Sequence, residues 1–161
     1  MANYNFGFAL LNTTTGTFEW AFALYSTVAP QATVQLFRRE YDPSVQAYRV
    51  VHRPTTFSAV YGVVQISQPP FPANLYTTVF NTARDHSPDE RGLNPGRVSW
   101  GSAAWAIRLV LQLRQLVNFP LRLQDHDIYV HVTNQLIAQL QNMQWVRNQQ
   151  VPCVKLSNGG F

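Results

Sequence analysis

The first 26 residues alternate large apolar side chains with small or polar ones at the two-residue period of a β-strand. Two segments carry this pattern, NYNFGFALLN (3–12) and GTFEWAFALYS (16–26), and the turn sequence TTTG joins them. In both segments the large side chains share one face: Phe6, Phe8, Leu10, Phe18, Trp20, Phe22 and Leu24. The pattern predicts an aromatic-rich β-hairpin at the start of the chain.

The middle of the chain is less regular. Residues 28–41 fit either a short helix or a third strand, and YRVVHR and TFSAVYGVVQIS predict strands broken by Pro54. Proline, glycine and charged residues are then dense over 68–98. We expect a long irregular segment here, the least ordered part of the chain.

The last third predicts helices alternating with strands. SWGSAAWAIRLVLQLRQLVNFP is typical of a helix that Ser99 or Ser102 caps and Pro120 ends. DIYVHV from Asp127 has strand period, and a second helix begins after it, capped by Thr133 or Asn134. VPCVKLS predicts a final strand.

This order predicts a single domain over 1–161 with an α/β (α+β) fold. We expect a mixed β-sheet with an N-terminal antiparallel meander, two main helices, and right-handed parallel crossovers at the other side of the sheet.

Charged residues are scarce, at 12% of the chain, and the formal net charge is +4. The polar surface is therefore largely Gln, Asn, Thr and Ser, which favours contact with other chains or self-association. Lys155 is the only lysine among twelve cations. Arginine suits phosphate and carboxylate recognition, although a GC-rich genome explains the same bias equally well.

No feature indicates secretion or a membrane. The lone Cys153 cannot form an internal disulfide, no uncharged apolar run reaches the roughly 18 residues of a membrane span, and MANYNFGFALL predicts a strand. We expect a soluble intracellular protein.

The hairpin followed by helix, strand, helix and strand resembles the ribonuclease H-like fold. SWGSAAWAIRLVLQLRQLV is similar to the first helix of that family, and IYVHVTNQLIAQL to its next strand and second helix. The resemblance covers the last third of the chain by pattern and the first third by topology alone. It implies phosphodiester hydrolysis with two divalent metals held by carboxylates.

The carboxylates that the resemblance requires are absent. Asn12 stands near the end of the first strand, Ala104 or Trp105 in the helix, and Thr133 and Asn134 after the second strand. We interpret Asn12, Trp105, Thr133 and Asn134 as positions of a vestigial site, and we expect no metal, no cofactor and no catalytic residue.

Other chemistry is not indicated either. Asp85, Asp89 and Glu90 fit a solvated turn, and Asp127 lies about 13 Å along a strand from His131, too far to share one metal. The sequence holds no HExxH, CxxC, GxSxG or phosphate-binding glycine loop.

The leading hypothesis is a non-catalytic scaffold that binds a protein partner or itself. A second hypothesis is nucleic-acid binding by five arginines of the last third: Arg97, Arg108, Arg114, Arg122 and Arg147. A viral structural protein, capsid-like or self-assembling, is a third, on composition alone. A divalent-metal nuclease with unrecognised carboxylates is a fourth.

Overall fold

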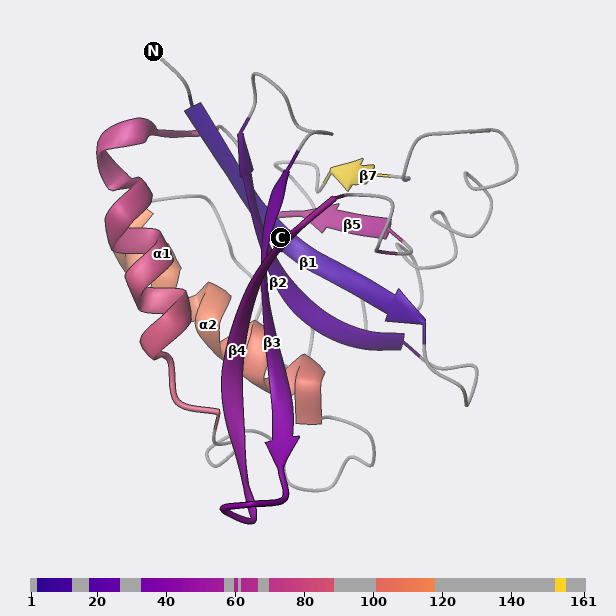
Figure 1. Cartoon of the computed structure of the whole chain (residues 1–161). Helices are drawn as coiled ribbons and strands as arrows, with labels where there is room; N and C mark the ends of the chain where they lie inside the picture. The colour runs from indigo at the N-terminus through magenta and orange to yellow at the C-terminus, as the bar shows by residue number, and fades with distance from the viewer. Residues whose placement is uncertain are drawn as a thin grey trace.

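The computed structural model describes residues 3–12, 18–26, 33–56, 60, 62–66, 70–88, 101–117 and 153–155. Within these ranges seven strands form one sheet, in the order β4-β3-β2-β1-β5-β7 with β6 paired to the start of β1 (Figure 1). The strands are β1 (Asn3–Asn12), β2 (Phe18–Ser26), β3 (Val34–Asp42), β4 (Ala47–Thr55), β5 (Gly62–Gln65), β6 (Phe71–Pro72) and β7 (Cys153–Lys155).

The predicted antiparallel meander is confirmed. β1 and β2 form a hairpin with Phe8 opposite Phe22 and Leu10 opposite Trp20. The ambiguous segment 28–41 contributes a strand, β3, and not a helix. Pro54 does not break a strand but lies inside β4, opposite Gln35. β4 is the last strand in the described order of the sheet, and an edge strand tolerates the missing N–H of proline.

The sheet is mixed, as predicted. β5 pairs antiparallel with β1, and β7, which matches the predicted final strand, pairs parallel with β5. β5, the neighbour of β1 on the side away from β2, is therefore antiparallel to β1 and comes before both described helices in the sequence. We had expected parallel crossovers on this side of the sheet. The strand predicted from Asp127 and the helix predicted from Thr133 lie outside the described residues.

The structure describes two α-helices, α1 and α2, and only α2 was predicted from the sequence. α2 (Gly101–Val117) confirms the helix expected after Ser99. α1 (Tyr76–Asp85) follows a short 3-10 turn, η2 (Ala73–Leu75), inside the segment 68–98 that was expected to be irregular. That expectation was wrong over 71–85, because α1 packs an apolar stripe of Tyr76, Val79, Phe80 and Ala83 against the core, which stabilises a helix of only ten residues.

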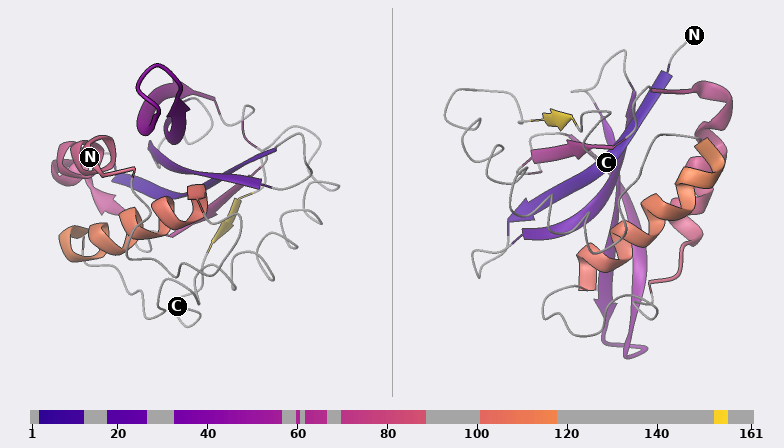
Figure 2. Two further views of the ribbon diagram at one scale, coloured as in Figure 1. Left: turned by 90° about the horizontal axis from the view of Figure 1, so that it is seen from below. Right: turned by 180° about the vertical axis from the view of Figure 1, so that it is seen from behind.

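Both faces of the central strands are buried. The large side chains of β1 and β2 form one core with the two helices, which lie on the same side of the sheet (Figure 2). Trp105 of α2 is fully buried in this core. The other face carries smaller buried side chains, among them Ala9, Ala21 and Ala23. The alternation predicted from the first 26 residues thus separates two cores.

Gly7 marks the closest approach of two strands. A Cβ added to Gly7 would lie 2.2 Å from the carbonyl oxygen of Val64 and 2.9 Å from the Cα of Gln65, both in β5. Backbone atoms in a paired strand cannot swing aside as a side-chain end can. Glycine is therefore required where β1 meets β5.

We predict that Gly7→Ala lowers the free energy of unfolding by about 3 kcal/mol or more, because β5 must separate from β1 to admit the methyl group. Urea denaturation measures this loss. Ala9→Gly, two residues along on the same face, is the control and should cost only about 1 kcal/mol. A loss no greater for Gly7→Ala than for the control would contradict the close approach.

Candidate binding surface

The hairpin of β3 and β4 extends beyond the rest of the sheet. β3 pairs with β2 only from Val34 to Phe37, whereas it pairs with β4 along its whole length. We call residues 38–51, beyond the pairing with β2, the arm. Figures 1 and 2 show the arm reaching past the end of α2.

A short turn closes the arm. Asp42 accepts hydrogen bonds on Oδ1 from both the backbone N–H of Ser44, at 3.0 Å, and its hydroxyl, at 2.6 Å. These bonds lower the pKa of the Asp42 carboxyl below its ordinary value. Gln46 adopts a positive φ of 52°, a conformation that side-chain-bearing residues adopt at a cost of about 1 kcal/mol. The turn is thus locally specified and not a loose loop.

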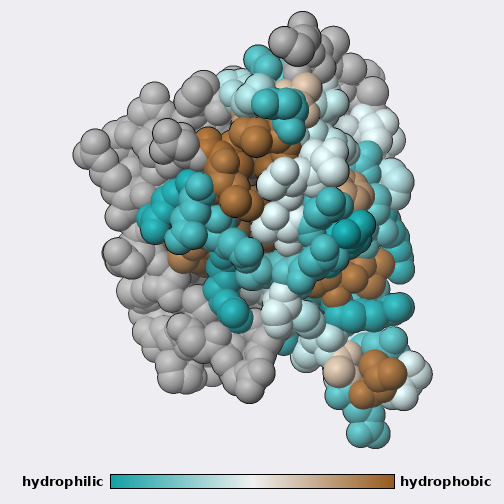
Figure 3. Space-filling model, turned by 90° about the vertical axis from the view of Figure 1, so that its left-hand side faces the viewer, coloured by the Kyte–Doolittle hydropathy of each residue, from teal (hydrophilic) through white to brown (hydrophobic). Residues whose placement is uncertain are grey.

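One face of the arm is aromatic and cationic. Tyr41 and Tyr48 lie opposite each other with ring centroids 5.3 Å apart, and the guanidinium carbon of Arg39 lies 3.4 Å from the centroid of Tyr48. Tyr41 is 53% exposed and Tyr48 45% exposed, and Val45 in the turn is 65% exposed. In the space-filling view the tip of the arm protrudes and carries hydrophobic surface (Figure 3). Stacked yet exposed rings of this kind are typical of binding surfaces.

The side chain of Arg39 is held in place by the segment that follows α1. Its Nε donates a hydrogen bond of 2.7 Å to the carbonyl oxygen of Pro88, which follows α1. At the base of the arm, His52 packs against Phe37 and Phe80, with ring centroids 4.8 Å from each. The ring of Tyr48 therefore rests on a side chain that is fixed to the body of the protein.

The opposite face of the arm carries ion pairs. Arg38 forms two hydrogen bonds with the carboxylate of Glu19 in β2, at 2.9 and 3.2 Å, and lies 3.6 Å from Glu40. The pairing raises the pKa of Arg38. Arg53 lies 3.6 Å from Glu40, and Arg49 lies 3.5 Å from Asp42. Arg49 and Arg53 remain 61% and 63% exposed, so both guanidinium groups are accessible to a partner.

The resemblance predicts a metal site at the corner between the end of β1 and the start of α2. The N–H of Trp20, opposite Leu10 on β1, donates to Oγ of Ser102 in the first turn of α2, at 3.0 Å. The start of α2 thus lies beside the end of β1, which Asn12 terminates. Ser102 was predicted as a cap, and its hydroxyl instead joins the helix to the sheet.

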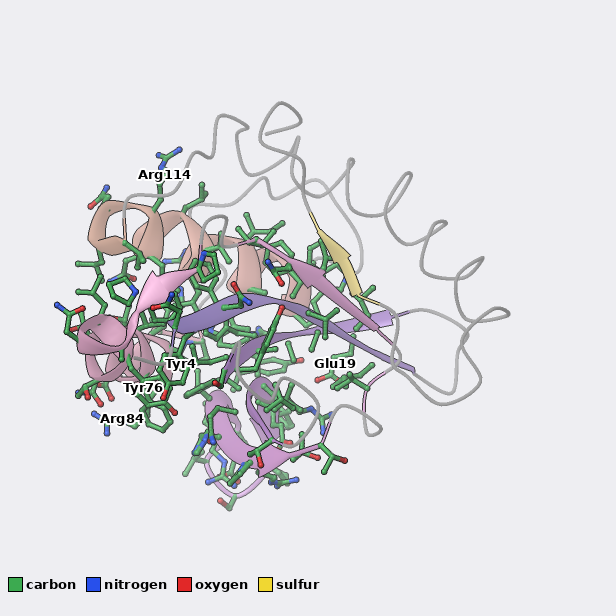
Figure 4. The ribbon with its side chains drawn as sticks, turned by 90° about the horizontal axis from the view of Figure 1, so that it is seen from above. Tyr4, Glu19, Tyr76, Arg84 and Arg114 are labelled. Carbon is green, nitrogen blue, oxygen red and sulfur yellow. The ribbon has the colours of Figure 1, made fainter. Side chains whose placement is uncertain are left out.

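Carboxylates do not gather at this corner in the described structure. Glu19 is the acid nearest to it in the paired register, and Arg38 occupies both of its oxygens (Glu19 is labelled in Figure 4). No group of three or more His, Cys, Asp or Glu residues that could hold a metal occurs within the described ranges. The described part of the corner offers a divalent metal no free set of oxygen ligands.

A second polar surface lies between the two helices. His86, directly after α1, hydrogen-bonds through Nδ1 with Oε1 of Gln112 at 2.9 Å. These two residues and Arg108 line an open hollow of about 520 Å³. His86 Nε2 and Trp105 Nε1 are buried, and neither has a hydrogen-bond partner in the part of the chain that the structure describes. Burial lowers the pKa of His86, and Arg108 lowers it further against the opposing bond from Gln112.

The structure places only some of the predicted site residues. Arg108 and Arg114 lie on α2, and Arg114 points away from the sheet, on the far side of α2 from the arm (Figure 4). Arg114 therefore does not form one surface with the arm. Trp105 is a core residue. The other predicted positions lie outside the described residues: Arg97, Arg122, Arg147, Thr133 and Asn134.

The exposed residues of the arm were missed by sequence reasoning. Alternation in VQLFRREYD and AYRVVHRPT places Arg39, Tyr41 and Tyr48 on one face once the two strands are paired. That signal was present in the sequence, but the segment before Asp42 was ambiguous between helix and strand. The pairing that joins the two segments was therefore not predicted.

Comparison with protein-family models, with curated proteins and with solved structures gives no match. The described helices include none that is both long enough and apolar enough to cross a membrane. The interpretation of the surface therefore rests on its geometry.

We predict that the protein loses stability as the pH falls from 7.5 to 5.5. Burial lowers the pKa of His52 and His86, so the folded state takes up fewer protons than the unfolded chain, whose histidines titrate near pH 6.5. Protonated His86 would also bury an N–H that has no acceptor among the described residues. Stability is therefore fully present above about pH 6.5 and declines below it.

The measurement is the free energy of unfolding in urea at the two pH values, for the wild type and His86→Gln. The variant should show a smaller loss between them. Asp85→Asn is the control, because Arg84 lowers the pKa of Asp85 and keeps it ionised throughout this range. An equal loss in the wild type and His86→Gln would contradict the role given to His86.

Proposed function

We propose that this protein is a non-catalytic module that binds nucleic acid through the arm. The observation that carries the proposal is a cluster of arginines: three on the arm and Arg53 directly beyond it, with Arg49 and Arg53 largely exposed, on a hairpin that also carries two exposed tyrosines. Arginine contacts phosphate, and tyrosine stacks on bases.

The charge distribution supports the proposal. Residues 38–53 hold four arginines against two acids, Glu40 and Asp42. Both acids face the side of the ion pairs, so the face with Arg39 and the tyrosines presents no carboxylate of the arm to a phosphate. Surface ion pairs contribute little, so Arg49 and Arg53 can exchange a carboxylate for a phosphate at small cost.

We also propose that the protein has no nuclease activity. We interpret the scaffold as a degenerate ribonuclease H-like fold, supported by the meander and by the contact of Ser102 with Trp20, which brings α2 to the end of β1. The antiparallel position of β5 departs from the crossovers that the resemblance implies. A nuclease needs oxygen ligands at this corner, and Arg38 occupies those of Glu19.

We predict that the protein binds a labelled 20-nucleotide RNA or DNA at 50 mM salt and that the affinity falls steeply as salt rises. Arg49→Gln with Arg53→Gln should reduce the slope of log K against log salt by about 1 to 2, about one for each phosphate that an arginine no longer neutralises. The control is Arg84→Gln, because Arg84 lies on α1 away from the arm and pairs with Asp85. Fluorescence anisotropy measures both quantities.

Two results would contradict this function. The first is no binding at low salt. The second is binding that the arm variant leaves intact and Arg114→Gln removes, which would return the contact to α2. We also expect neither binding nor oligonucleotide integrity to change when Mg²⁺ or Mn²⁺ replaces a chelator, and metal-dependent cleavage would restore the nuclease alternative.

A further inference from the structure

We infer that the nucleic acid taken by the arm is single-stranded, with unpaired bases stacking on Tyr41 and Tyr48. The inference rests on the proposed function and specifies its substrate class. It depends on the tyrosines, whereas the proposed function depends on the arginines, so the two can fail separately.

Two exposed rings on a rigid hairpin form a platform. A tyrosine at a flexible tip would lose conformational freedom on binding and gain little. Here Arg39 lies 3.4 Å from the centroid of the Tyr48 ring, and the bond to the carbonyl oxygen of Pro88 holds Arg39 in turn. Tyr41 packs against Tyr48 with the ring planes at 67°. Both rings are oriented before any ligand arrives, which lowers the entropic cost of stacking.

Both tyrosine residues leave about half of their surface exposed to a ligand. Tyr41 and Tyr48 are 53% and 45% exposed although each contacts another side chain. Bases within a duplex already stack on their neighbours, so only an unpaired base gains from a protein ring. This makes the tyrosines selective for single strands, whereas the arginines attract either form.

The phosphate contacts lie on the same strand as one ring. Tyr48, Arg49 and Arg53 all belong to β4, the last strand in the described order of the sheet, and Arg49 and Arg53 are about 13 Å apart along it. A single strand that follows this edge can place phosphates on the arginines and turn a base onto Tyr48. This arrangement requires no change in the conformation of the arm.

The test compares a fluorescein-labelled 12-nucleotide single strand with a blunt duplex of the same sequence, using the full chain. Tyr41→Ala and Tyr48→Ala should each weaken single-strand binding about fivefold or more and leave duplex binding and the salt slope unchanged. Tyr41→Phe and Tyr48→Phe keep the rings and should bind as the wild type does. The melting temperature of every variant confirms that it is folded.

Each other outcome overturns the inference in a distinct way. Equal losses on single strand and duplex, or no loss with alanine, exclude stacking but leave arginine-based binding in place. An equal loss with phenylalanine assigns the contact to the hydroxyl groups. Absence of all binding in the wild type removes the proposed function as well. A fall in particle mass with the alanine variants, without a change in binding, would make the arm a contact between copies of this chain.

Discussion

The pairing of β2 with β3 over only four residues determines how the rest of the structure is arranged. Because β3 leaves β2 after Phe37, the outer edge of β2 near Trp20 is open to another partner, and Ser102 of α2 supplies it. The same divergence lets β3 and β4 continue as a two-stranded arm. The Arg38 to Glu19 ion pair spans the point of separation. The divergence of β3 from β2 thus positions both α2 and the candidate binding surface on the arm.

The separation of β3 from β2 also determines which side chains lie at the corner between β1 and α2 and which lie on the arm. The corner between β1 and α2 is where the ribonuclease H resemblance calls for metal-binding carboxylates. Glu19 is engaged by Arg38, and Trp105 fills the core beneath the helix. The exposed chemistry of the described chain lies instead on the arm, where rings and guanidinium groups suit recognition and not bond cleavage. We therefore consider the scaffold, for which we propose a resemblance to an enzyme fold, separately from the arm, for which we propose a role in binding.

The parts of the fold that follow from local pattern were predictable. Strict alternation in 3–12 and 16–26 assigned the faces of β1 and β2, and a wide apolar stripe identified α2. α1 was missed because it is only ten residues long and lies between segments dense in proline and charge, although Tyr76, Val79, Phe80 and Ala83 recur at helical spacing. Pro54 was interpreted as a break because nothing in the sequence tells an edge strand from a central one.

The candidate site was predicted less well than the fold. Alternation shows which side chains share a face of β3, but it cannot show where β3 leaves its neighbour, since that depends on contacts distant in sequence. The exposure of Tyr41 and Tyr48 follows from this departure. The arginines selected from the last third were chosen by proximity to an expected cleft, and Arg114 proves to lie on the far side of α2 from the arm.

The most direct test of the account is a map of the contact surface by nuclear magnetic resonance. Backbone amide shifts of the isotopically labelled full chain would be followed while a 12-nucleotide single strand is added at low salt. We predict that the changes concentrate in residues 38–51, with the largest around Tyr41 and Tyr48. Changes confined to 101–117, or to the hollow beside His86, would contradict the assignment of the arm as the element that contacts nucleic acid.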